Sequence, residues 1–306
     1  MDPILEDLNK KYVGRTPHMR DIGIRITGTD RARGTMVLPA RADWLGDPAR
    51  GVLHPGPITV LADSACGLAV GSAIERRIPY ATLDLRMDYL RPASLDLDVH
   101  CEAHCYRVTR SVAFIRAEVW QADRDQPIAS AQASFMLSTP PGTRPSAPGG
   151  ITTAPPPETP ASAGPAWLAP ATSDPVMADR PVPYLDYLGI RVSQADGQPL
   201  FRMPYQEKLI GNPRLPALHG GVIAGFSESA AILQLVHTLR GQKLPKSIDF
   251  SIDYLRAGRP EETFASCEVI RLGSRVAMVQ VRCWQRSPDY PITVSRGHFL
   301  LAEPDA

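Results

Sequence analysis

The chain has 306 residues, a length that predicts two domains of ordinary size. Its 33 basic and 32 acidic residues leave a net charge of +1, which gives no electrostatic reason to expect a nucleic-acid partner. Apolar residues make up 43%, which excludes an intrinsically disordered chain. Five cysteines in so long a chain do not form the pattern of a disulfide framework.

The N-terminal segment, residues 1–7, is acidic and lacks the apolar core of a secretory signal. No run approaches the roughly 20 uninterrupted apolar residues that a membrane span needs. We therefore expect no membrane span and a cytoplasmic location.

Each half of the chain predicts the same order of elements. Two short strands come first, followed by a loop that ends at a histidine, an apolar helix, and four strands or strand-like runs. The strands and the helix are expected at 22–29, 33–39 and 56–73 in the first half and at 189–194, 198–203 and 220–239 in the second.

The two halves share short sequences at a nearly constant spacing. Residues 84–92 match residues 249–257 at five of nine positions, with an offset of 165. Residues 53–56 match residues 218–221 at the same offset, including the histidine and the last glycine. Self-similarity at one period indicates a domain that is present twice.

A segment rich in Pro, Ala, Ser, Thr and Gly separates the two copies. It lacks the apolar content for a core and is typical of a semi-extended linker. We predict an N-terminal domain of residues 1–139, a linker of residues 140–182 and a C-terminal domain of residues 183–306.

The helix at 56–73 is apolar on almost every face, which indicates a buried helix. The strand after it alternates, with Leu83, Leu85 and Met87 apolar and the residues between them polar. An α+β fold, in which an antiparallel sheet wraps around one central helix in each copy, satisfies both patterns.

One carboxylate interrupts each apolar helix. Asp63 and Glu228 both lie nine residues after a histidine, His54 in the first copy and His219 in the second. Burying a carboxylate is costly unless it is paired, hydrogen-bonded or protonated. Its presence in both copies points to a function, while a structural hydrogen bond at the domain boundary is the alternative.

A cluster of His100, Cys101, His104 and Cys105 raises the question of a metal site. These residues lie on a predicted strand, whose side chains alternate between faces. The cysteines would face the core and the histidines the other side, so the four side chains cannot converge on one tetrahedral ion. We therefore expect no metal at this position.

The sequence His219-Gly220-Gly221-Val222-Ile223-Ala224, with an acidic residue nine after the histidine, resembles the signature of hotdog-fold thioesterases of the phenylacetate-degradation (PaaI-like) acyl-CoA group. Residues 247–255 resemble that family's strand after the helix. The resemblance covers both copies and implies two hotdog domains in tandem. It further implies an acyl-CoA thioester as substrate, no cofactor beyond the coenzyme A of that substrate, and a homo-oligomer of the tandem chain.

In the family, each active site lies between two hotdog units. The resemblance therefore brings Asn212, His219 and Gly220 together with Asp63 and Thr82 from the other copy. The Gly220 N–H, at a helix N-terminus, would hold the oxyanion. Asp63 would act as general base on water or as nucleophile. Asn212 would position water or substrate, and Thr82 would orient the nucleophile or the carboxylate.

The pseudo-equivalent site would combine Asp47, His54 and Pro55 with Glu228 from the second copy. Proline has no backbone N–H, so the expected oxyanion donor is absent unless the next residue supplies it. Asp47 stands where the second copy has an asparagine, and two facing carboxylates would raise one pKa. We predict that the Asp63 site is active and the Glu228 site weak or dead. Substrate contacts are expected from Gly221, His54, Gly56 and Ser247.

Two questions stay open at this stage. The histidines are either catalytic or, as is more common in such loops, structural supports of the turn. Two other functions are considered: a hotdog enoyl-CoA hydratase, which the seven-residue spacing of Asp47 and His54 disfavours, and a non-catalytic acyl-CoA-binding module.

Overall fold

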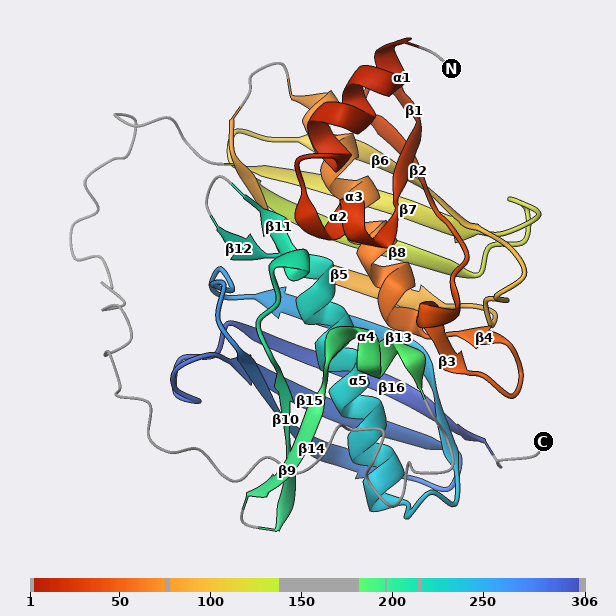
Figure 1. The fold of residues 1–306 in the computed structure, drawn as a ribbon, viewed down its shortest axis with the longest axis vertical. Coiled ribbons are helices and arrows are strands. Elements are labelled where there is room, and N and C mark those ends of the chain that lie inside the picture. The colour runs from red at the N-terminus through yellow and green to blue at the C-terminus, as the bar shows by residue number, and fades with distance from the viewer. Residues whose placement is uncertain (1–2, 75–77, 138–181, 196, 214–215, 303–306) are drawn as a thin grey trace.

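A computed structural model describes residues 3–74, 78–137, 182–195, 197–213 and 216–302. Nearly all of the predicted 140–182 linker lies outside the described residues, and the predicted division into domains stays a prediction. From residue 17 in the first copy and residue 183 in the second, the two copies contain the same elements in the same order (Figure 1).

The helices of the first copy are α1 (Pro3–Leu8), the π-helical turn η1 (Asn9–Val13), α2 (Pro17–Ile22), the 3₁₀ turn η2 (Ala42–Trp44) and α3 (Pro55–Ala73). Its strands are β1 (Arg25–Asp30), β2 (Arg33–Leu38), β3 (Leu45–Asp47), β4 (Val52–Leu53), β5 (Tyr80–Tyr89), β6 (Val99–Val108), β7 (Val112–Trp120) and β8 (Ala129–Leu137).

The helices of the second copy are α4 (Pro183–Leu188), the 3₁₀ turn η4 (Glu207–Leu209) and α5 (Gly220–Thr238). Its strands are β9 (Arg191–Ala195), β10 (Gln198–Met203), β11 (Ile210–Asn212), β12 (Ala217–Leu218), β13 (Leu244–Tyr254), β14 (Thr263–Leu272), β15 (Val276–Trp284) and β16 (Thr293–Ala302).

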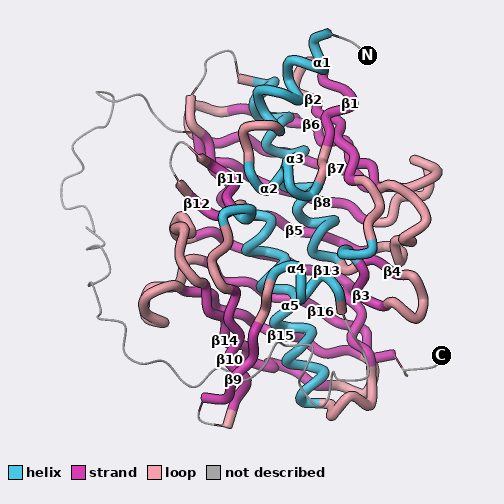
Figure 2. Tube along the Cα trace, viewed as in Figure 1, coloured by secondary structure: helices cyan, strands magenta, loops and turns pink. Residues whose placement is uncertain are grey.

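Twelve strands form one antiparallel sheet in the order β1-β2-β6-β7-β8-β5-β13-β16-β15-β14-β10-β9. The sheet is continuous because β5 of the first copy pairs with β13 of the second. Arg86 lies opposite Ser251, its own counterpart at the offset of 165, so a pseudo-twofold axis passes through this pair. Figures 1 and 2 show α3 in the upper half and α5 in the lower half of the view, both against one face of this sheet.

The two central helices pack directly on each other, and glycines make the approach possible. A Cβ added at Gly221 would lie 2.6 Å from the Cα of Val60. At the pseudo-equivalent contact, a Cβ added at Gly225 would lie 3.3 Å from the Cα of Gly56. Residues from one copy therefore reach the first turn of the helix in the other copy.

The predicted central helices are confirmed to within one residue at either end. The predicted start of the first strand in each copy is wrong, because a short helix precedes it. Pro17 and Pro183 open these helices at their first positions, and Gly23 and Gly189 close them with φ of 75° and 70°. The strands then begin at Arg25 and Arg191.

One described helix, α3, is long and apolar enough to span a membrane by length and composition. This corrects the expectation that no segment approaches such a span. In the fold, however, 83% of its most apolar window is buried, because the sheet and α5 cover it.

Candidate active site

Each central helix begins at a buried histidine whose ring accepts a hydrogen bond from the helix. His219 Nδ1 accepts the N–H of Gly221 at 3.1 Å, and His54 Nδ1 accepts that of Gly56 at 3.0 Å. Burial lowers the pKa of both imidazoles, that of His54 to about 3, while Asp63 partly opposes the effect at His219. An accepting Nδ1 leaves the proton of the neutral ring on Nε2. This geometry gives both histidines a structural role as helix caps.

Asp63 joins the two copies at the first turn of α5. Its Oδ2 accepts the N–H of Gly221 at 2.8 Å, and its Oδ1 accepts the hydroxyl of Thr82 at 2.9 Å. The side chain is 7% exposed, so these bonds replace most of its hydration. The positive end of the α5 dipole also faces the carboxylate. These contacts bring Asp63, Thr82, His219 and Gly221 together, and the catalytic roles that the resemblance gave to residues of this cluster stay predictions.

Gly220 supplies space and a free donor beside this carboxylate. A Cβ at this position would lie 3.0 Å from Asp63 Oδ2, so a side chain would press on the carboxylate. The Gly220 carbonyl accepts the hydroxyl of Tyr254 at 2.8 Å, which fixes the first peptide of α5. Among the described residues no acceptor pairs with the Gly220 N–H, while Gly221 donates to Asp63. The two glycines thus have different roles.

Glu228, the pseudo-equivalent of Asp63, has different partners. Its Oε2 accepts the hydroxyl of Tyr89 at 2.8 Å, and Tyr89 in turn lies 2.8 Å from Thr59 Oγ1. Burial raises the pKa of Glu228 to about 7, and the nearby hydroxyls of Ser247 and Tyr89 limit the rise. Ser247 lies close enough to lower the Glu228 pKa. Among the described residues, however, neither Ser247 Oγ nor Glu228 Oε1 has a hydrogen bond of ordinary geometry.

The helix terminus opposite Glu228 offers this carboxylate no donor. Pro55 has no N–H, and the N–H of Gly56 is directed to the His54 ring. The expected repulsion between Asp47 and Glu228 is wrong. Asp47 lies 3.9 Å from Arg50, three residues along its own loop, and burial is the main cause of the raised Glu228 pKa.

Tyr184 on α4 fills the space at the Glu228 site. Its ring centroid lies 4.7 Å from that of His54. A Cβ at Gly56 would lie 2.3 Å from the tyrosine ring, and one at Gly225 would lie 2.6 Å from its hydroxyl. Gly225 is the counterpart of Val60 in the first copy. Because Gly225 has no side chain, the Tyr184 ring occupies the room that a valine side chain would fill.

His18 on α2 is the counterpart of Tyr184 and lies near the Asp63 site. Its ring centroid is 5.4 Å from that of His219, and its Nδ1 lies 3.1 Å from the Lys208 carbonyl. Burial lowers the His18 pKa well below its usual range. The sequence analysis did not single out His18 or Tyr184, although the alignment of Pro17 with Pro183 puts the two residues at equivalent positions.

Asn212 lies at the exposed end of β11, one residue beyond Gly211. A Cβ at Gly211 would lie 2.6 Å from the His219 Cα, so this strand packs against the histidine loop. The structure thus positions Asn212 on a segment that borders the Asp63 site, and its predicted contact with water or substrate stays a prediction.

The predicted alternation of the histidine and cysteine cluster is confirmed. Cys101 and Cys105 are buried, and His100 stacks on Trp120 on the other face. Within the described ranges, no group of three His, Cys, Asp or Glu side chains could hold a metal ion.

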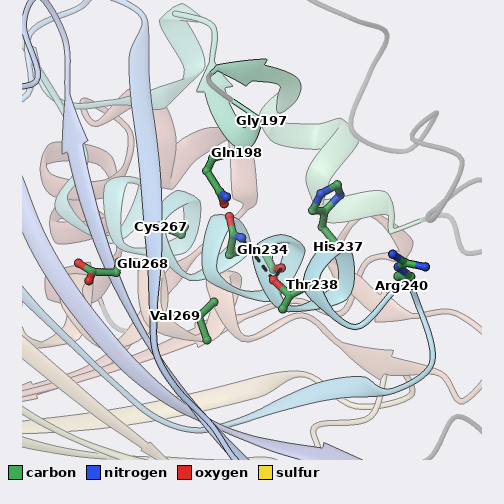
Figure 3. Close-up of a pocket in the computed structure, with 9 residues that line it drawn as sticks. All are labelled: Gly197, Gln198, Gln234, His237, Thr238, Arg240, Cys267, Glu268 and Val269. Carbon is green, nitrogen blue, oxygen red and sulfur yellow. Dashed lines mark hydrogen bonds between the residues drawn. The ribbon is translucent and has the colours of Figure 1, made fainter.

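A cavity of about 580 Å³ lies at the opposite end of α5 (Figure 3). Gln234, His237 and Thr238 line it from the last turns of the helix, facing Cys267 and Glu268 of β14. Gln234 is fourteen residues beyond Gly220, or roughly 20 Å along the helix. This cavity is therefore separate from the Asp63 site.

In each copy a central helix packs against the sheet and carries a carboxylate that lies opposite the first turn of the other copy's central helix. This fold is that of a tandem hotdog protein. A model of the thioesterase superfamily matches residues 50–128 and 215–292, one match in each copy and together half of the chain. The chain belongs to this superfamily and is a thioester hydrolase. The resemblance seen in the sequence and the tandem hotdog fold are thereby confirmed.

Two sequence relatives match parts of the chain. One is a protein of Halobacterium salinarum whose name assigns it provisionally to the esterases, 33% identical over 135 residues, or 40% of this chain and 85% of that protein. The other is the medium/long-chain acyl-CoA thioesterase YigI of Salmonella typhimurium, 28% identical over 146 residues, or 44% of this chain and 93% of YigI.

Two solved structures share the tandem architecture over nearly the whole chain. A hotdog-fold protein from Alicyclobacillus acidocaldarius has a TM-score of 0.61 at 13% identity and covers 91% of this chain and 96% of its own. The acyl-CoA thioesterase II TesB2 of Mycobacterium marinum has a TM-score of 0.55 at 14% identity, and the match covers 89% of this chain and 93% of TesB2. At such identities the likeness establishes the fold alone.

Proposed function

We propose that the chain hydrolyses an acyl-CoA thioester to a free acid and coenzyme A at the Asp63 site. The observation that carries this proposal is the placement of Asp63 between the Gly221 N–H and the Thr82 hydroxyl, beside the Gly220 N–H. The name of the Salmonella relative supports coenzyme A as the thiol of the substrate.

In the proposed reaction, the thioester carbonyl oxygen binds at the Gly220 N–H. Water attacks the carbonyl carbon, and its proton passes to Asp63 as general base. The Gly220 N–H and the α5 dipole stabilise the oxyanion that forms. When the tetrahedral intermediate collapses, the C–S bond breaks and the thiolate leaves with little need for acid assistance, since a thiol has a pKa near 8.5. Direct attack by Asp63 is the competing route.

The proposal assigns catalysis to one of the two sites. The Glu228 site lacks an N–H on Pro55, its carboxylate bonds to Tyr89, and the Tyr184 ring occupies the helix terminus. These three differences support a site that is weak or dead.

Release of free thiol from a panel of acyl-CoA substrates tests the function. We expect Asp63→Asn to lower kcat by about 10² to 10⁴, the range typical of a lost general base, while Glu228→Gln stays within about twofold of the unmodified chain. Equal losses in the two variants would contradict the asymmetry. Binding of acyl-CoA without release would favour a non-catalytic module. A single turnover in ¹⁸O-labelled water reports on nucleophilic attack, which forms a mixed anhydride with Asp63. If water then attacks the Asp63 carboxyl carbon, an Asp63 oxygen enters the product and ¹⁸O enters Asp63. If water attacks the acyl carbon, the product takes ¹⁸O as it does in the general-base route, so ¹⁸O in Asp63 is the result that identifies the nucleophilic route.

The cytoplasmic location and the homo-oligomer of the tandem chain remain predictions. Gel filtration with light scattering tests the second of these.

A further inference from the structure

The N-terminal helix lies outside the repeat, yet the fold holds it firmly. The Asn9 side chain donates to the Ile26 carbonyl at 2.9 Å and accepts the Ile26 N–H at 2.8 Å, so it pairs with the edge of β1. Val13 at the end of η1 is buried in the core. These contacts fix the turn on which Tyr12 lies.

Tyr12 reaches the face of α3 that continues from Asp63. A Cβ at Gly67, one turn after Asp63, would lie 3.1 Å from the Tyr12 hydroxyl and 3.9 Å from the Tyr80 ring. A Cβ at Gly71, one turn further, would lie 2.9 Å from the Tyr80 hydroxyl. Burial raises the pKa of Tyr12 well above its usual range, and Tyr80 and Asp63 raise it further because they lie nearby.

The surroundings of Asp63 restrict where an acyl group can extend. The carbonyl must lie between Asp63 and the Gly220 N–H. In one direction along α3, Val60 packs so closely on Gly221 that a Cβ on the glycine would lie 2.6 Å from the Val60 Cα, which leaves no room for a chain. In the other direction, Gly67 has no side chain, and the Tyr12 hydroxyl lies 3.1 Å from the position that its Cβ would take, so the tyrosines occupy this face of α3.

The second copy has no counterpart of this arrangement. At the offset of 165, Gly67, Gly71 and Tyr80 correspond to Ile232, Val236 and Pro245. The glycine positions and the tyrosines that face them therefore occur together only beside Asp63, the carboxylate assigned to catalysis.

We propose that Tyr12 and Tyr80 close the acyl pocket about one helical turn, or roughly 5.4 Å, beyond Asp63, and so restrict the enzyme to compact acyl groups. A short straight chain or a single ring fits this length, and a long straight chain does not. This inference rests on the proposed function and goes beyond it by naming the class of acyl group.

Rates of thiol release test the inference with acetyl-, hexanoyl-, phenylacetyl- and dodecanoyl-CoA on the full chain. We expect the unmodified chain to have a higher kcat/KM for the first three than for dodecanoyl-CoA. Tyr12→Ala should raise the dodecanoyl-to-acetyl ratio of kcat/KM by about tenfold or more, since even one methylene of pocket fit is worth about 10- to 200-fold. Tyr12→Phe keeps the ring and should keep the ratio within about threefold.

Two further variants separate pocket shape from folding. Tyr80→Leu opens the same space from β5, leaves every residue of the N-terminal segment unchanged although it removes the interaction of Tyr80 with Tyr12, and should shift the ratio in the same direction. Tyr106→Ala, at an exposed tyrosine on β6, is the matched control and should leave the ratio unchanged. The inference is overturned if the unmodified chain prefers dodecanoyl-CoA, or if folded Tyr12→Ala and Tyr80→Leu variants keep its ratio. No release from any substrate by the unmodified chain would instead overturn the proposed function, and the inference with it.

Discussion

The Gly221 N–H lies 2.8 Å from Asp63 Oδ2 and joins two residues that are 158 positions apart in the chain. The donor belongs to α5 of the second copy and the acceptor to α3 of the first. This bond forms only when the two central helices pack on each other. The duplication therefore does more than double the domain, because the Asp63 cluster requires residues from both copies.

Gly220→Ala tests the requirement for space beside the carboxylate. The added Cβ would lie 3.0 Å from Asp63 Oδ2 and 3.5 Å from the Tyr254 hydroxyl, so Asp63 must move. We expect kcat/KM to fall by about tenfold or more, a loss in the lower part of the range for a displaced catalytic group. Unfolding free energy should hold or rise, because alanine is the better helix former by up to about 1 kcal/mol.

Gly28→Ala is the control for that change, because its Cβ would make only ordinary contacts with Thr35. If Gly220→Ala hydrolyses the substrate at the unmodified rate, the close approach at Gly220 has no role in catalysis.

Thr82→Val tests the hydrogen bond to Asp63 Oδ1. Valine keeps the shape of threonine but removes the donor, which leaves one buried carboxylate oxygen without its partner. The loss of such a bond is worth about 1–3 kcal/mol, so we expect kcat to fall by about tenfold. Thr82→Ser, which introduces the residue found at the equivalent position 247, keeps the hydroxyl and should retain most of the activity. Equal losses in the valine and serine variants would show that packing, and not the hydrogen bond, is what matters.

Glu228 should make the stability of the fold depend on pH. Its pKa is raised from 4.5 to about 7 in the folded chain, so the folded state binds the proton more tightly than the unfolded state. The contribution to stability is fully present below pH 4.5 and is lost as the pH rises through 7. The upper limit of the loss is about 3 kcal/mol, from 1.36 kcal/mol per pKa unit.

Glu228→Gln removes this titration while keeping a side chain that can accept from Tyr89. Denaturant unfolding at pH 5 and pH 8 should therefore show a smaller decrease in free energy for the variant than for the unmodified chain. An identical decrease in both would mean that Glu228 does not titrate in this range.

The repeat predicted much of the fold and part of the candidate site. The two apolar helices and the strand alternation around Leu85 follow from local pattern and from the offset of 165, whereas the grouping of residues around Asp63 was implied by the resemblance to hotdog thioesterases. Pro55 indicated a missing donor because the loss of an N–H is a property of the residue itself. The helices, the strand and the missing donor need no knowledge of which surfaces meet.

The errors and omissions have a common physical origin in tertiary contact. Asp47 aligns with Asn212, but its carboxylate lies 3.9 Å from Arg50 and is not among the causes of the raised Glu228 pKa. Tyr12 belongs to a helix outside the repeat, so no offset could place it above Gly67. Tyr184 was in register with His18, but the alignment could not reveal that its ring lies on Gly56.

Tyr184 leads to the strongest test of why one site is inactive. In an Asp63→Asn background, the remaining turnover must come from the Glu228 site. Pro55→Gly alone restores a backbone N–H but leaves the tyrosine ring against Gly56, so we expect no gain. Pro55→Gly combined with Tyr184→His introduces the glycine and the histidine of the Asp63 site, and should raise kcat/KM by about tenfold or more, since an oxyanion donor is worth about 10² to 10³.

Adding Glu228→Gln to this triple variant should abolish the gain, because the carboxylate is the only base proposed there. Thermal unfolding of each variant provides the folding control, and Tyr184→His alone shows whether opening the space is sufficient. A folded Asp63→Asn/Pro55→Gly/Tyr184→His chain with no gain would mean that the pairing of Glu228 with Tyr89 inactivates this site by itself. In that case we expect Tyr89→Phe in the same background to raise the rate, because it removes the hydroxyl that donates to Glu228 Oε2.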